Sequence, residues 1–143
     1  MATLANRGKW AENEAHEYLK YLSSKRAEFD FERLPDARAA MGRFKAMIGD
    51  FEFFMPGTHG VVEVKETKHS YRIAKDKLEQ LPRLHKRSMC GGLCIVLVHF
   101  SEAKKWRAVD AQWLPVGKAS WDLSIFPAFN TASEALKQWE ALA

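Results

Sequence analysis

One stretch near the middle of the chain constrains the fold more than any other. Residues 93–100 read LCIVLVHF, a nearly continuous apolar run of strand length that follows two consecutive glycines. A strand that is apolar on both of its sides must be covered on both faces of its sheet. The run therefore predicts a buried central strand, and helices packed against a central sheet give an α/β fold.

The rest of the chain supplies the expected partners of that strand. Apolar residues recur at helical spacing over residues 8–23, and alternation over 28–34 is typical of a strand. Residues 50–55 and 61–67 flank a Pro/Gly-containing turn at 56–60, which indicates a hairpin. Further elements are a basic helix over about 73–88 kinked at Pro82, a strand over 105–109, and a last helix N-capped by Thr131 or Ser133.

Size and charge narrow the class of protein. The 143 residues suit a single domain, with a motif-bearing core at about 6–109 and an aromatic C-terminal tail and helix at 110–143. The net charge is +4, and residues 65–87 hold eight basic against three acidic side chains. A basic face suits a nucleic acid, although a solvated lysine-rich surface would give the same count. We expect a cytoplasmic protein with no membrane contact and no nucleotide cofactor.

The two cysteines, Cys90 and Cys94, raise the question of zinc. A zinc site needs about four ligands, and His85 and His99 are the nearest candidates. Because Cys94 lies inside the apolar run, a buried thiol that packs as a small hydrophobic group is the favoured interpretation.

The sequence VVEVK carries the candidate chemistry. Alternation along a strand sends Val62 and Val64 to one face and Glu63 with Lys65 to the other. Asp50 opens the preceding hairpin strand, and a hairpin brings such positions to within about 5 Å. Two adjacent carboxylates repel each other unless a cation lies between them, and Mg²⁺, or Mn²⁺ in its place, prefers oxygen ligands. An isolated Glu-x-Lys is more often an ordinary cross-strand ion pair, so the upstream acid carries the argument.

Asp50 followed by Glu63-Val64-Lys65 resembles the PD-(D/E)XK nucleases, and within them the Holliday-junction resolvases of the bacterial RecU and archaeal Hjc groups. Residues 6–12 (NRGKWAE) resemble the opening motif of those enzymes, and the resemblance carries their metal-site glutamate to Glu12 and a downstream glutamine to Gln80. It implies a restriction-endonuclease-like fold with a mixed central sheet flanked by helices. It further implies Mg²⁺ held by Asp50, Glu63, the Val64 carbonyl and Glu12, and a homodimer that nicks four-way DNA junctions twice.

Several alternatives stay open. Asp36, in a literal Pro-Asp pair, is the fallback for Asp50. The short 34–49 segment indicates a compact, phage-type or archaeal-like version of these enzymes. The substrate could instead be linear or damaged duplex, or the site could be inactive in a DNA-binding module. The aromatic tail favours packing over base stacking. The basic residues expected to contact phosphates are Arg7, Lys9, Arg38, Arg43, Lys45, Lys68 and Lys75.

Overall fold

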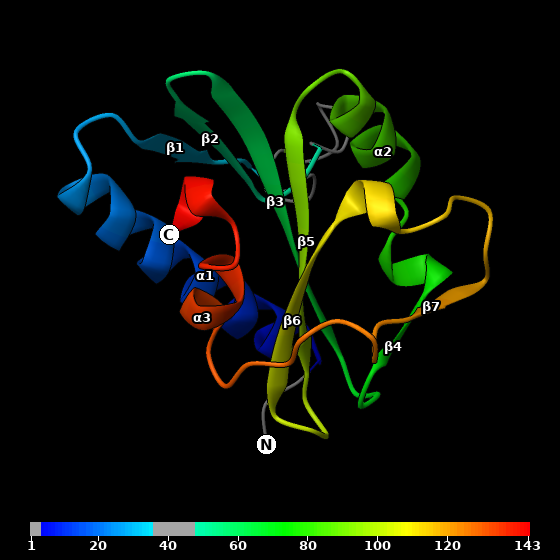
Figure 1. Ribbon diagram of the computed structural model, residues 1–143. Coiled ribbons are helices and arrows are strands. Elements are labelled where there is room, and N and C mark those ends of the chain that lie inside the picture. The colour runs from blue at the N-terminus through cyan, green and yellow to red at the C-terminus, as the bar shows by residue number, and fades with distance from the viewer. Residues whose placement is uncertain (1–3, 36–47) are drawn as a thin grey trace.

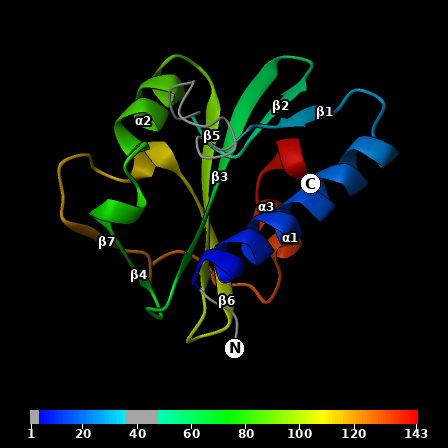
Figure 2. The same ribbon diagram turned by 180° about the vertical axis from the view of Figure 1, so that it is seen from behind.

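The computed structural model describes residues 4–35 and 48–143 and shows a central sheet between two layers (Figures 1 and 2). The sheet of this described part has five strands in the order β1-β2-β3-β5-β6. Strand β3 pairs with β5 in parallel, and the other neighbours are antiparallel, so the sheet is mixed. The strands are β1 (Asp30–Arg33), β2 (Phe51–Met55), β3 (Thr58–Thr67), β5 (Leu93–Phe100) and β6 (Lys105–Asp110).

Strand β5 has the central role that its sequence predicts. It lies between β3 and β6, and its residues 94–100 are all buried. Ile95 and Leu97 join the core on one face of the sheet, whereas Val96 and Val98 join the core on the other. The apolar run thus reflects burial on both faces, as expected of an inner strand with a parallel neighbour.

Different elements cover the two faces. Helix α1 (Leu4–Lys25) and the short helix α3 (Ala132–Leu136) pack on the face of Ile95, which we call the α1 face. Helix α2 (Leu81–Met89) packs on the opposite face, the α2 face, with a small second sheet of β4 (Arg72–Ala74) and β7 (Ser120–Asp122) (Figure 1). No helix within the described ranges is both long and apolar enough to span a bilayer.

The prediction of a single helix over 73–88 is wrong. The chain first forms β4 and a 3₁₀ turn (Lys75–Lys77), and α2 begins only at Leu81. Pro82 stands in the first turn of α2, where its missing N–H is not needed by the helix, so it starts the helix instead of kinking it. Leu78, Leu81 and Leu84 are buried as expected.

Two other boundaries differ from expectation. The hairpin turn is shorter than 56–60, because β3 already begins at Thr58. Gly60 is a strand residue whose role is steric: a Cβ there would lie 2.1 Å from the ring of Phe53. Thr131 caps α3 by accepting a hydrogen bond from the Glu134 N–H (3.2 Å), but that helix ends at Leu136, and a 3₁₀ turn (Glu140–Leu142) follows.

Candidate active site

The β2–β3 hairpin brings Asp50 and Glu63 together. Phe51 pairs with Val62, and the Asp50 N–H donates to the Val62 carbonyl (2.9 Å), so Asp50 falls opposite Glu63 one step further along. Phe51 and Val62 both point into the core of the α1 face. Alternation therefore directs Asp50 and Glu63 to the α2 face, side by side.

The carboxyl group of Asp50 is held in a strained electrostatic environment. Its Oδ2 accepts a hydrogen bond from the Val64 N–H (2.7 Å), which stabilises the ionised form. Burial, and next the neighbouring charge of Glu63, nevertheless raise the pKa of Asp50 to about 8. A proton or a cation is needed to relieve this repulsion near neutral pH.

Glu63 and Lys65 form the second half of the cluster. Glu63 is only 5% exposed, and its Oε1 lies 3.1 Å from the Lys65 Nζ. The two side chains share a face of β3, as their spacing predicts. The Lys65 side chain is about one-third exposed, whereas that of Glu63 is buried, so Lys65 connects the buried acid to the surface.

Gly49 fixes the backbone just before Asp50. Its φ of +85° lies in the left-handed region, and a Cβ there would approach the Val61 Cγ1 to 2.1 Å. A residue with a side chain would have to displace β3. On the other side, the Leu34 N–H donates to the Asp50 carbonyl (2.8 Å), which ties Asp50 to the end of β1.

Glu12 approaches the same cluster from α1. Its Oε1 lies 2.9 Å from both Nε and Nη2 of Arg33, at the end of β1. The charge of Glu12 contributes to the raised pKa of Asp50, after burial and Glu63. The charge of Glu12 therefore acts on Asp50, while the Glu12 carboxylate itself pairs with Arg33.

The donor set can be compared with what Mg²⁺ requires. Within residues 4–35 and 48–143, no group of three or more His, Cys, Asp or Glu side chains is arranged to hold a metal. Mg²⁺ commonly uses only one or two carboxylates and keeps several waters. Asp50 and Glu63 supply two carboxylates. The Val64 carbonyl points to the same side of β3 as the Val64 N–H, which bonds to Asp50. The β2–β3 pairing ends before Val64, so this carbonyl is placed to be a further oxygen ligand. The raised pKa of Asp50 is the observation that fits a cation here.

The other expected site residues lie on further elements or outside the described residues. Gln80 stands at the N-cap of α2, where its Oε1 accepts from Arg83 Nη1 (3.1 Å). Lys9 is exposed on α1, Lys68 just after the end of β3, and Lys75 on the 3₁₀ turn. Asp36, Arg38, Arg43, Lys45 and the side chain of Arg7 lie outside the described residues.

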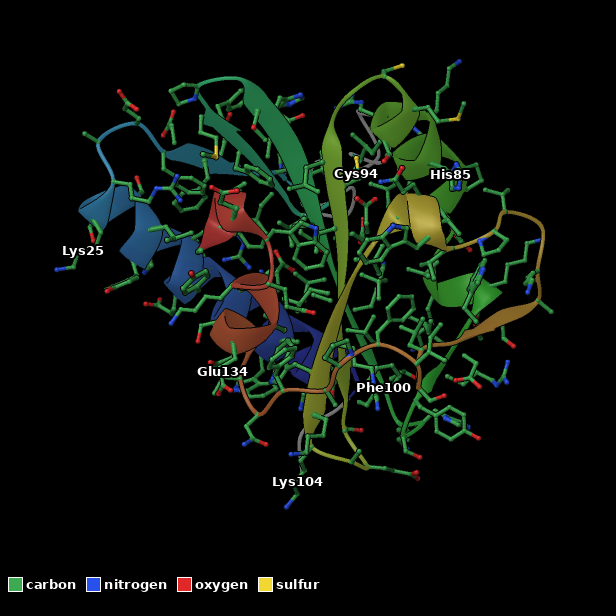
Figure 3. The ribbon with its side chains drawn as sticks, viewed as in Figure 1. Lys25, His85, Cys94, Phe100, Lys104 and Glu134 are labelled. Atoms are coloured by element: carbon green, nitrogen blue, oxygen red, sulfur yellow. The ribbon has the colours of Figure 1, made fainter. Side chains whose placement is uncertain are left out.

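Cys94 is buried, as the buried-thiol interpretation predicts. Cys90 is exposed, and burial, above all, raises the pKa of the Cys94 thiol to about 11. Figure 3 shows Cys94 on β5, beneath the α2 layer, with His85 on that layer. In the described part of the chain neither cysteine belongs to a metal-binding group.

A second buried acid, Glu66, was not predicted from the sequence. Glu66 and His99 face each other across β3 and β5 on the α1 face, with Glu66 Oε2 2.7 Å from His99 Nδ1. The rings of Trp10 and Trp106 enclose this histidine, at centroid distances of 4.9 and 4.6 Å. The signal for this pair is a histidine within an apolar run, because a polar side chain in a buried strand needs a partner.

The architecture defines a fold class. A mixed sheet flanked by helices is the restriction-endonuclease-like fold, and the expected fold is thereby confirmed. Among solved structures the chain is similar to Hjc of Archaeoglobus fulgidus, a Holliday junction resolvase from an archaeal hyperthermophile. The TM-score is 0.51 at 23% identity, covering 87% of this chain and 98% of Hjc. Neither a protein-family model nor a curated protein matches the chain.

Proposed function

We propose that this protein is a metal-dependent endonuclease that cuts four-way DNA junctions. The observation that carries the proposal is the pairing of Asp50 with Glu63 on adjacent strands, beside Lys65. Their order along the chain is that of the PD-(D/E)XK nucleases, and the fold is shared with an archaeal resolvase. The sharing of a fold supports the proposal without supplying the activity.

Each residue has a role that its position allows. Asp50 and Glu63, with the Val64 carbonyl, would hold Mg²⁺, and Mn²⁺ would substitute for it. When bound, the ion supplies a Lewis acid that polarises the phosphoryl oxygen and lowers the pKa of water. Lys65 is placed to orient the attacking water and to stabilise negative charge on the phosphate, because its ammonium group reaches the surface from the buried acid.

Glu12 would act from the edge of the site. Its bonds to Arg33 hold its carboxylate at the end of β1, and its charge already acts on Asp50. We propose that it orients water or the metal, as the resemblance implies. Gln80, whose side chain accepts a hydrogen bond from Arg83, has the catalytic role that the resemblance implies in this proposal.

Junction cutting requires two nicks of matched position, which a two-fold symmetric dimer with two such sites provides. We therefore propose a homodimer as the active form. Sedimentation of the purified protein with and without a four-way junction would test this part separately from catalysis.

The central experiment measures cleavage of a synthetic four-way junction and of a linear duplex built from the same arms. We expect nicking of the junction in Mg²⁺ or Mn²⁺, none with a chelator, and little cutting of the duplex. Equal cutting of both substrates would indicate a nuclease for linear or damaged duplex. Salt-sensitive binding with no cleavage in either metal would indicate an inactive DNA-binding module.

Variants assign the activity to the cluster. Asp50→Asn, Glu63→Gln and Lys65→Ala should each abolish nicking while junction binding stays nearly intact. The matched controls are Glu17→Gln and Lys20→Ala, which remove the same charges from an exposed ion pair on α1. Full activity of the Asp50 or Glu63 variant would overturn the proposed site.

A further inference from the structure

One face of α2 is basic and stands beside a hollow. Arg83, Lys86 and Arg87 follow one another at the three- and four-residue spacing that places side chains on a common helix face. Together with Ile48 and Cys90 they line a pocket of about 310 Å³. The opposite side of α2 is anchored in the core by Leu81 and Leu84.

This pocket adjoins the candidate active site. Ile48, in its wall, precedes Asp50 by two residues. Arg87 Nη1 lies 3.4 Å from Glu52 Oε1, and Glu52 is the next residue after Asp50 on the same face of β2. Two strand residues span about 7 Å, so the pocket lies close enough to the acids for one DNA strand to contact both.

Helix electrostatics account for only part of this basic set. Lys86 and Arg87 stand in the last turn of α2, where cations favour the helix dipole. Arg83 stands in the first turn, where a cation is disfavoured, and it is held there by Gln80. Glu52 meets the set from the sheet, through Arg87. Because Arg83, Lys86 and Arg87 line one hollow, their positive charges suit an anion there and not the helix dipole alone.

We propose that this α2 pocket binds a phosphate of the DNA backbone next to the one that is cut, an inference that rests on the proposed function. Arginine and lysine side chains make such contacts and fix the register of a protein on its duplex. In the free protein Glu52 holds Arg87, and backbone phosphate replaces that carboxylate when DNA binds. The α2 pocket thereby sets which phosphate reaches Asp50 and Glu63.

The test is the salt dependence of binding to a four-way junction in the presence of chelator, so that no cleavage intervenes. Each lost phosphate contact reduces the slope of log affinity against log salt by about 0.9. Arg83→Ala/Lys86→Ala/Arg87→Ala should weaken binding and reduce the slope by about 1, because one phosphate contact is lost. Alanine favours helix, so α2 should persist, and circular dichroism confirms it.

The control removes an equal charge from the α1 face. Lys20, Lys25 and Lys137 are exposed there, and their triple alanine variant should leave the slope near that of the wild type. An unchanged slope in the α2 variant, or an equal fall in the control, overturns this inference but leaves the proposed nuclease intact. Absence of any salt-sensitive binding by the wild type would instead sink the proposed function.

A chemical probe reports on the same pocket independently. Cys90 lines it and is exposed, whereas Cys94 is buried with a raised thiol pKa. Bound junction should slow alkylation of Cys90 by neutral iodoacetamide several-fold, as measured by mass spectrometry. Glu52→Gln should tighten junction binding, because it frees Arg87. An unaltered Cys90 rate in saturated complex, or weaker binding by Glu52→Gln, contradicts the proposal.

Discussion

Strand β3 carries two buried acids three residues apart, and their surroundings differ in almost every respect. Glu63 points to the α2 face, where a second acid, Asp50, is its neighbour and Lys65 leads to the surface. Glu66 points to the α1 face, where His99 is its partner and two tryptophan rings contact that histidine. Both acids are less than one-tenth exposed.

Burial alone does not distinguish the two acids. Beside Glu63 a second carboxyl group, that of Asp50, is buried, and burial followed by the charge of Glu63 raises the pKa of Asp50 to about 8. Around Glu66 one oxygen is paired with His99, and the other, Oε1, is buried without a hydrogen-bond partner among the described residues. The first arrangement would favour a bound cation, as we propose, whereas the second joins two strands inside the protein. A neighbouring carboxyl group and a lysine that leads to the surface are what distinguish Glu63.

The largest expected difference between the two acids is in catalysis. Glu63→Gln should reduce junction nicking by about 10²- to 10³-fold, the usual cost of losing one group that stabilises transition-state charge. Glu66→Gln should retain most of the activity at a temperature where it is folded. Cleavage rates under single-turnover conditions measure both. Equal losses in the two variants would remove the functional distinction between the faces.

The pH dependence of stability should depend on Asp50. Its folded-state pKa, about 8, lies above the ordinary value of 3.8, so the fold favours the protonated acid. The resulting stability is complete below 3.8 and is lost as pH rises through 8. Without metal, the Tm of the wild type should fall over this range relative to that of Asp50→Asn. Parallel Tm profiles for the two proteins would contradict the raised pKa.

Stability should respond more strongly on the α1 face. Glu66→Ala removes the hydrogen-bond partner of the buried His99, at a cost of about 1–3 kcal/mol in the free energy of unfolding. Urea denaturation measures the loss, and Glu14→Ala, at an exposed position of α1, is the control. A loss equal to that of the control would show that the Glu66–His99 pair contributes no net stability.

The smallest effect concerns Glu12. Its charge raises the pKa of Asp50, but it ranks below burial and Glu63 among the causes. Glu12→Gln should therefore lower the pKa of Asp50, and by less than Glu63→Gln does. Carboxyl chemical shifts followed by NMR during a titration give both values. A larger shift from Glu12→Gln would place Glu12 closer to Asp50 than Glu63 is.

Local patterns predicted the elements whose partners are near in sequence. The β2–β3 hairpin and the double-sided burial of β5 follow from alternation and from an apolar run. The pairing of β4 with β7 could not be predicted, because three-residue strands leave no periodic signal and the partners are far apart along the chain. Pro82 was misplaced because one residue can either interrupt a helix or begin it.

The site residues also divide into those that a local pattern predicts and those that depend on the complete fold. Asp50, Glu63 and Lys65 were predicted as neighbours because a hairpin register fixes them, and the structure places them so. The Glu66–His99 pair depends on parallel register between β3 and β5, which only the complete sheet determines. Gln80 lies at the N-cap of α2, and the sequence did not predict this position because it placed the start of the helix earlier.

Gly49 has a consequence for how such a chain can diverge. Because its backbone is left-handed and a β-carbon there would collide with Val61, position 49 accepts no other residue unless β3 shifts. A substitution of Asp50 leaves this bend unchanged, whereas a substitution of Gly49 displaces the bend and the acid that follows it. The placement of Asp50 beside Glu63 therefore depends on a residue that has no functional group of its own.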